Sequence, residues 1–143
     1  MPDSIVVDDV LGTLTWDETY QWYQGKLEVA PGFWTELRLL PDDKTRQADL
    51  ARARQAAQHL QRQEVALREA AADALLPRHN DVWNDGSPID RETFVGRMTL
   101  EGLTVYGDGS AALDYNDGDL FWGHNIVVSL HENDTVQSVG IEG

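Results

Sequence analysis

The chain has 143 residues, of which 41% are hydrophobic, and carries a formal net charge of −14 at pH 7. This size fits a single domain, residues 1–143, because two domains of half the length would each be marginal. Cysteine is absent, which excludes disulfides, thiolate metal sites and a thiol nucleophile and suits a reducing cytoplasm.

The two ends of the sequence carry the excess negative charge. Residues 1–43 contain 9 acidic and 2 basic residues, residues 44–97 contain 8 and 9, and residues 98–143 contain 8 and 0. Such a surface repels nucleic acid and anionic lipid and attracts a basic protein partner. The alternative is that the acidity serves only solubility or reflects a salty cell interior. We find neither a signal-peptide pattern nor a membrane-length apolar run, so we expect a soluble cytoplasmic protein.

Residues 11–40 show the alternation of apolar and polar positions that is typical of a β-meander, here of three strands. Asp17-Glu18-Thr19 and Pro31-Gly32 supply the two turns. The positions that we expect to share strand faces are Leu14 and Trp16, then Tyr23, Gly25, Leu27 and Val29, then Phe33, Thr35, Leu37 and Leu39.

From residue 44 the apolar residues recur at helical spacing. Pro41-Asp42-Asp43 ends the last strand and offers a helix N-cap. Two apolar stripes, over residues 50–60 and 67–75, are separated by Gln61-Arg62-Gln63-Glu64, and one helix through both would be unusually long. We therefore predict two helices with a break at residues 61–64. A turn of helix and a loop follow at residues 78–86, then a short helix that Asp90 caps and Gly96 ends.

Residues 103–141 predict a second meander, with turns at residues 107–110, 116–118 and 132–134. Leu103 and Val105 mark its first strand, and the second contains Ala111, Leu113 and Tyr115. We expect the following strand to run to Leu130 and to be the one on which the rest of the chain packs. Its expected core face consists of Leu120, Trp122, His124, Ile126, Val128 and Leu130. The fold class that follows is α+β, with an antiparallel sheet from two β-meanders and a helical middle segment packed on one face.

Three segments together resemble a bacterial family. They are L-G-T-L-T-W-D-E-T-Y-Q-W-Y-Q-G-K-L near the start, N-D-V-W-N-D-G-S-P-I-D-R-E-T-F in the middle, and D-G-S-A-A-L-D-Y-N-D-G-D-L-F-W-G-H-N-I-V-V near the end. The family is the domain of unknown function numbered twenty-two sixty-two, and D-G-D-L-F-W-G-H is the most specific piece. The resemblance covers most of the chain, implies one fold unit and names no catalytic residue.

One acidic turn is a candidate metal site, formed by Asp114, Asn116, Asp117 and Asp119. An EF-hand loop needs Gly at its sixth position and Glu at its twelfth, whereas a loop that starts at Asp114 has Gly118 fifth and Asn125 twelfth. Asp-Gly and Asn-Asp are also ordinary turn residues, so we favour a role in the turn alone and commit to no metal or cofactor.

His124 is either a core side chain with satisfied hydrogen bonds or a general base at the end of a pocket, with Asp114 or Asp119 as its carboxylate. We favour the structural role, because neither a second histidine at ligand spacing nor an obvious nucleophile accompanies it. His59 and His79 are expected on helical surfaces or ends, and His131 in a turn.

Composition and candidate residues favour a non-enzymatic acidic binding domain, with an immunity-type inhibitor of a basic protein as its specific form. The expected partner-binding residues are Tyr20, Trp22, Asp108, Asp117 and Asp119, since exposed aromatics bordered by carboxylates suit a basic partner. Nucleotide-binding, serine-hydrolase and zinc-protease motifs are absent from the sequence. The alternative is a small hydrolase or ligand-binding enzyme with a pocket at His124 and Asp114 or Asp119.

Overall fold

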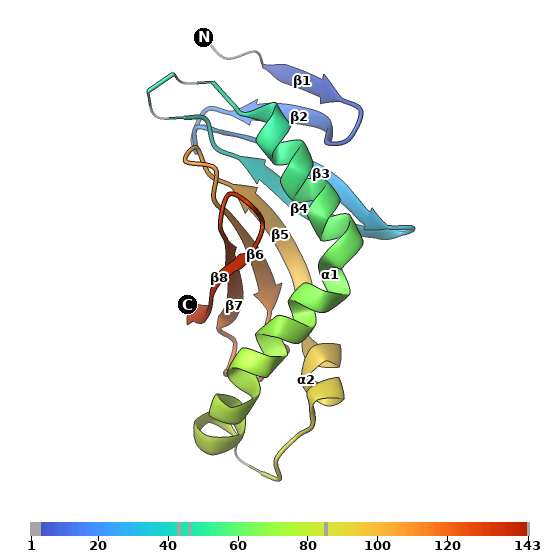
Figure 1. Cartoon of the computed structure of the whole chain (residues 1–143), viewed down its shortest axis with the longest axis vertical. Helices are drawn as coiled ribbons and strands as arrows, with labels where there is room; N and C mark the ends of the chain where they lie inside the picture. The colour runs from blue at the N-terminus through green and yellow to red at the C-terminus, as the bar shows by residue number, and fades with distance from the viewer. Residues whose placement is uncertain (1–3, 43, 46, 85, 143) are drawn as a thin grey trace.

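The computed structural model describes residues 4–42, 44–45, 47–84 and 86–142. Within them the chain forms eight strands, two α-helices and one π-helical turn (Figure 1). In chain order these are β1 Ile5–Asp8, β2 Gly12–Asp17, β3 Trp22–Ala30, β4 Phe33–Leu39, α1 Leu50–Arg78, the π turn His79–Trp83, α2 Arg91–Arg97, β5 Thr99–Val105, β6 Ala111–Asn116, β7 Asn125–Leu130 and β8 Val136–Glu142.

All eight strands join one sheet in which spatial order follows chain order. Six of the neighbouring pairs are antiparallel, and only β4 and β5 run parallel, with Leu37 opposite Leu103 and Leu39 opposite Val105. The predicted α+β class and its two meanders are therefore confirmed. The parallel junction was not predicted; it arises because the chain leaves β4 through a helical crossover, the connection that parallel neighbours require.

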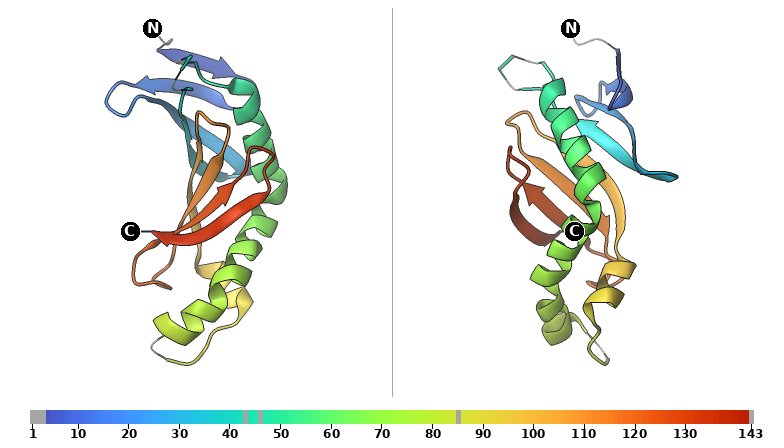
Figure 2. Two further views of the ribbon diagram at one scale, coloured as in Figure 1. Left: turned by 60° about the vertical axis from the view of Figure 1, so that its left-hand side comes forward. Right: turned by 45° about the vertical axis from the view of Figure 1, so that its right-hand side comes forward.

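One face of the curved sheet is covered by α1, and the opposite face carries neither helix (Figure 2). The predicted alternation of the first meander is confirmed, since Leu14, Tyr23, Leu27, Leu37 and Leu39 are buried. Against them pack small residues of α1, which allow the helix to approach the sheet closely; those buried are Ala53, Ala56, Ala57, Ala71 and Ala72. The helical middle segment thus packs on one face, as predicted.

The predicted break at residues 61–64 is wrong, because α1 is one helix of 29 residues. Three residues of the polar run are exposed, and the fourth, Glu64, is buried in an ion pair with Arg68 at 2.6 Å. Arg68 also donates to the Val95 and Met98 carbonyls. A polar run can therefore continue the helix, because its one inward member has a charged partner.

Both ends of α1 differ from the prediction. Its N-cap is Asp49, whose carboxylate accepts the Arg52 N–H at 3.0 Å, whereas Asp42 accepts the backbone N–H groups of Lys44 and Thr45 in a separate turn. Asp43, the other predicted cap residue, lies outside the described residues.

At the far end of α1, Pro77 lies inside the helix, which widens directly afterwards into the π turn. Proline cannot donate a helical hydrogen bond, and such local widening is a usual response to a disrupted helix. The short helix capped by Asp90 is confirmed.

The expectation of one long strand ending at Leu130 is corrected. Only Asn125–Leu130 is a strand, and residues 118–123 form turns. Consecutive residues Leu120 and Phe121 are both buried and Trp122 is 66% exposed, which no strand alternation permits. This strand, β7, is second from the edge of the sheet, and the centre is the β4–β5 junction. The edge strand β1 was not predicted.

Asp8 connects β1 to α1. Its carboxylate accepts hydrogen bonds from Arg54 at 2.7 Å and from the N–H groups of Val10 and Leu11 at 3.0 Å. The Arg54 hydrogen bond lowers the pKa of Asp8, burial opposes this shift, and the two backbone N–H groups lower it further.

A lowered folded-state pKa stabilises the protein above the unfolded value of about 4, and the stabilisation disappears as pH falls through the folded value. We therefore expect Asp8→Asn to reduce the free energy of unfolding at pH 7. As the pH falls below about 4, the variant's free energy of unfolding should decrease less than that of the unsubstituted protein. Urea denaturation at pH 7 and pH 3 measures both effects. Asp9→Asn, at the exposed neighbour, is the control; an equal effect there would contradict the assignment.

Candidate functional site

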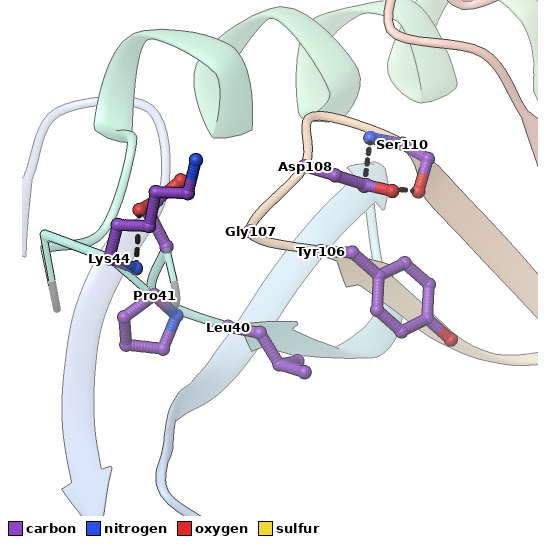
Figure 3. Close-up of a pocket in the computed structure, with 8 residues that line it drawn as sticks. Leu40, Pro41, Lys44, Tyr106, Gly107, Asp108 and Ser110 are labelled. Atoms are coloured by element: carbon purple, nitrogen blue, oxygen red, sulfur yellow. Dashed lines mark hydrogen bonds between the residues drawn. The ribbon is translucent and has the colours of Figure 1, made fainter.

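The uncovered sheet face is hollowed where β3 begins and where β4 and β5 end. One hollow of about 430 Å³ is lined by Tyr20, Trp22, Arg38 and Thr104, and a second of about 590 Å³ by Asp42, Lys44, Asp108 and Ser110. Leu40 and Tyr106 line both hollows, so the two are adjacent, and together we call them the sheet groove. Figure 3 shows the side chains of Leu40 and Tyr106 extending to the same side of the sheet.

An aromatic wall forms one end of the sheet groove. The rings of Tyr20 and Trp22 stack with their centroids 4.7 Å apart and their planes 12° apart. The turn before β3 holds Tyr20 in place, because the Asp17 carboxylate accepts the N–H groups of Thr19 and Tyr20 at 2.9 and 3.0 Å. Tyr20 is 63% exposed, so a large aromatic surface is available for a contact.

Two loops form the other end of the groove. In one, Asp108 accepts hydrogen bonds from the Ser110 N–H at 2.9 Å and its hydroxyl at 2.6 Å, both drawn in Figure 3. The second loop carries Pro41 and Asp42. The loops meet at Gly107, where an added Cβ would lie 2.5 Å from the Pro41 carbonyl oxygen. Only glycine permits this approach.

The charged groups that act on Tyr106 are mostly carboxylates. The pKa of Tyr106 is raised first by burial and then by Asp114 and Glu142, while Arg38 opposes and Asp108 adds to the increase. The pKa of Asp114 is raised by burial, although Arg38 lies 3.9 Å away and counteracts the shift. Around Tyr106, one guanidinium thus faces three carboxylates, those of Asp108, Asp114 and Glu142.

The structure brings together three of the five expected partner-binding residues, Tyr20, Trp22 and Asp108, along the sheet groove. Asp117 and Asp119 lie in the turn between β6 and β7. Asp117 is 2% exposed and its two oxygens accept the backbone N–H groups of residues 119, 121 and 123, so it organises that turn and presents no surface to a partner.

Three of the four candidate metal ligands, Asp114, Asn116 and Asp117, have other partners. Asp114 faces Arg38, and Asn116 accepts the Gly118 N–H at 2.9 Å. In the described part of the chain, no three His, Asp or Glu side chains come close enough to hold a metal ion. None of the described helices has the length and apolar character needed to cross a membrane.

His124 is half-buried after the turn, where its Nδ1 lies 2.5 Å from the Phe121 carbonyl oxygen, an arrangement in which the ring nitrogen donates. Asp119 instead lines a separate cavity of about 410 Å³ at the end of α1, together with His79, Trp83, Arg97 and Trp122, which we call the end cavity. Neither His124 nor Asp114 lines it.

Sequence reasoning missed His79, which is 4% exposed. We expected it on a helical surface or end, but the π turn after Pro77 places its ring edge-on against Phe121 and Phe94. The family resemblance could have pointed to this cavity, because two of the segments that carry it, N-D-V-W-N and D-G-D-L-F-W-G-H, both contribute lining residues.

Comparison with known proteins gives one match. A family model described as "Uncharacterized protein conserved in bacteria (DUF2262)" matches residues 8–141. This range includes both helices and all strands, apart from the first residues of β1 and the last residue of β8. Searches of curated proteins and of solved structures gave no match. Because the family model spans nearly the whole chain, this protein belongs to the uncharacterised bacterial family DUF2262.

Proposed function

We propose that the protein is a non-enzymatic binding domain whose sheet groove holds a basic segment of a protein partner. The observation that carries the proposal is the combination, on the sheet face that carries neither described helix, of an exposed aromatic stack with an excess of carboxylates over guanidinium groups around Tyr106. Aromatic faces and carboxylates together attract guanidinium and ammonium groups.

The groove already contains one example of the contact. The Arg38 guanidinium lies 5.8 Å from the centroid of the Trp22 ring, so this indole accepts a cation over its face. A basic side chain of a partner would find the same chemistry at Tyr20 and Tyr106, which are 63% and 41% exposed. The chain's charge of −14 would attract such a partner over a longer range.

In its specific form the proposal is an immunity-type inhibitor that acts in the cytoplasm and covers the active site of a basic toxin. Supporting features are the charge of the two β-rich ends and the cysteine-free composition. A toxin gene beside the gene for this protein, and a stoichiometric complex of the two products, would support this form.

The test uses lysine- and arginine-containing decapeptides of graded charge, with Trp fluorescence or anisotropy as the readout. We expect affinity to increase with positive charge and to fall strongly between about 50 and 300 mM salt, as screening of charged contacts requires. Trp22→Ala and Tyr106→Ala should each weaken binding of the best peptide by roughly tenfold, the loss that removing one aromatic anchor typically causes.

The matched control is Trp34→Ala. Trp34 is 55% exposed on the same sheet face, near the opposite end of β4, and does not line the groove. Equal losses for Trp34→Ala and Trp22→Ala would contradict a specific groove, and binding that is indifferent to salt would contradict a charge-driven partner.

The enzyme alternative has weaker support. Its candidate residues do not meet in any of the hollows described above: Asp119 lines the end cavity, Asp114 pairs with Arg38, and His124 lines neither the end cavity nor the sheet groove. An activity lost in His124→Ala without loss of folding would favour the enzyme over the binding domain.

A further inference from the structure

The end cavity is remote from the sheet groove. The π turn that forms one wall of it and the β5–β6 turn that borders the groove lie towards opposite ends of the molecule (Figure 1). Its chemistry is therefore independent of the proposed function.

His79, which lines this cavity, has one ring nitrogen without a hydrogen-bond partner among the described residues. The Asn80 amide is fixed by Ile89, since its Nδ2 donates to the Ile89 carbonyl and its Oδ1 accepts the Ile89 N–H, both at 3.1 Å. Because Asn80 Oδ1 is an acceptor, His79 Nδ1, at 3.2 Å from it, must donate. In the neutral ring Nε2 then carries the acceptor lone pair, and no described residue donates to it.

Two opposite charges, the exposed side chains of Arg97 and Asp119, line the same cavity without pairing with each other. Arg97 donates to the Gly118 carbonyl and has no ion-pair partner among the described residues. The Asp119 carboxylate likewise accepts no hydrogen bond from a described residue, and the two charges do not come within 4.0 Å of each other. Asp119 has a positive backbone φ of 66°, and the adjoining Gly118 has one of 57°.

An aromatic platform completes the site. Trp122 lines the cavity, is 66% exposed and has a φ of +58°, a conformation that bulky residues rarely adopt. Trp83 packs against it with the ring centroids 4.8 Å apart, and its enclosed indole N–H has no partner among the described residues. A buried donor without a partner and a strained aromatic are features that gather at binding sites.

We propose that the end cavity binds a small zwitterion, a free amino acid. Its ammonium group contacts Asp119 and His79 Nε2, its carboxylate contacts Arg97, and its side chain lies on Trp122. A dianion is disfavoured by Asp119 and a cation by Arg97, whereas a neutral sugar would form an ion pair with neither group. Only a ligand with both charges complements the two unpaired groups.

The test is isothermal titration of the protein with each free amino acid. We expect at least one, with a large apolar or aromatic side chain, to bind with a Kd below about 1 mM. Its N-acetyl derivative lacks the ammonium group and its amide lacks the carboxylate, and both should bind at least tenfold more weakly. Equal binding of either derivative, preferential binding of glucose, or no heat with any amino acid at 10 mM would overturn the proposal.

Three substitutions locate the site. Asp119→Asn keeps a residue that tolerates positive φ, Arg97→Gln removes the cation, and His79→Asn keeps an N–H for Asn80 while removing Nε2. Each should weaken amino-acid binding at least tenfold. Arg62→Gln, at an exposed arginine of α1, is the control and should bind normally, as should the groove variant Trp22→Ala. Normal binding by correctly folded Asp119→Asn and Arg97→Gln would place the ligand elsewhere.

Discussion

Replacement of Asp117 by alanine is expected to lower the free energy of unfolding by roughly 2–4 kcal/mol, which is large for one residue outside a strand or helix. The buried carboxylate accepts the N–H groups of Asp119, Phe121 and Gly123 at 3.0, 2.8 and 3.1 Å. Without it these donors lose their partner, and the turn that keeps Phe121 in the core is no longer held. Chemical denaturation measures the loss.

Two variants make the test specific. Asp117→Asn keeps one acceptor oxygen, but its NH₂ group faces a backbone N–H that needs an acceptor. Its loss of unfolding free energy should therefore be smaller than that of Asp117→Ala but not zero. Asp108→Ala removes a carboxylate that accepts two hydrogen bonds in an exposed turn, and should cost less than about 1 kcal/mol. If the Asp117 and Asp108 variants lost equal stability, burial would not be the cause.

Replacement of Arg52 by methionine is expected to cost roughly 3–5 kcal/mol, the usual range for breaking a buried ion pair. Arg52 is 7% exposed, donates to the Gly109 and His131 carbonyls at 2.5 and 3.2 Å, and lies 2.9 Å from Asp134. It therefore joins the start of α1 to two turns of the second meander. The substitution leaves Asp134 charged and buried, with Gln55 as its remaining side-chain partner.

A double-mutant cycle separates the charge from the packing. Asp134 has a φ of +68°, so asparagine is the substitution that removes the charge and still tolerates the backbone. We expect the double variant Arg52→Met with Asp134→Asn to be more stable than the sum of the two single losses predicts. Additive losses would show that the ion pair itself contributes little and that Arg52 acts through its two carbonyl contacts.

The sequence-based predictions succeeded where one physical signal dominated. Alternation located the core-facing residues of β3 and β4, glycine-rich and aspartate-rich turns located the hairpins of the second meander, and Asp90 located α2. They were wrong where local signals conflicted with distant contacts. Gln61–Glu64 suggested a helix break, but Arg68 supplies Glu64 with a partner, and the carbonyls that bind Arg68 lie about 30 positions further along the chain.

The candidate sites show the same division. Tyr20, Trp22 and Asp108 were recognisable as exposed aromatics and an acidic turn, but their meeting along one groove depends on the parallel β4–β5 pairing, which brings the ends of the two meanders together. His79 was not recognisable, since only the π turn after Pro77 directs it inward.

By itself the sequence determined the α+β class, the strand alternation, the family and the uneven charge, because these depend on neighbouring residues and on composition. The tertiary structure decided which face stayed uncovered, that α1 runs unbroken, and that Leu120 and Phe121 are both buried in a turn. The physical reason is that a buried polar or charged group is stable only with a partner, and the partners of Glu64, Arg52 and Asp117 are fixed by packing that spacing along the chain does not encode.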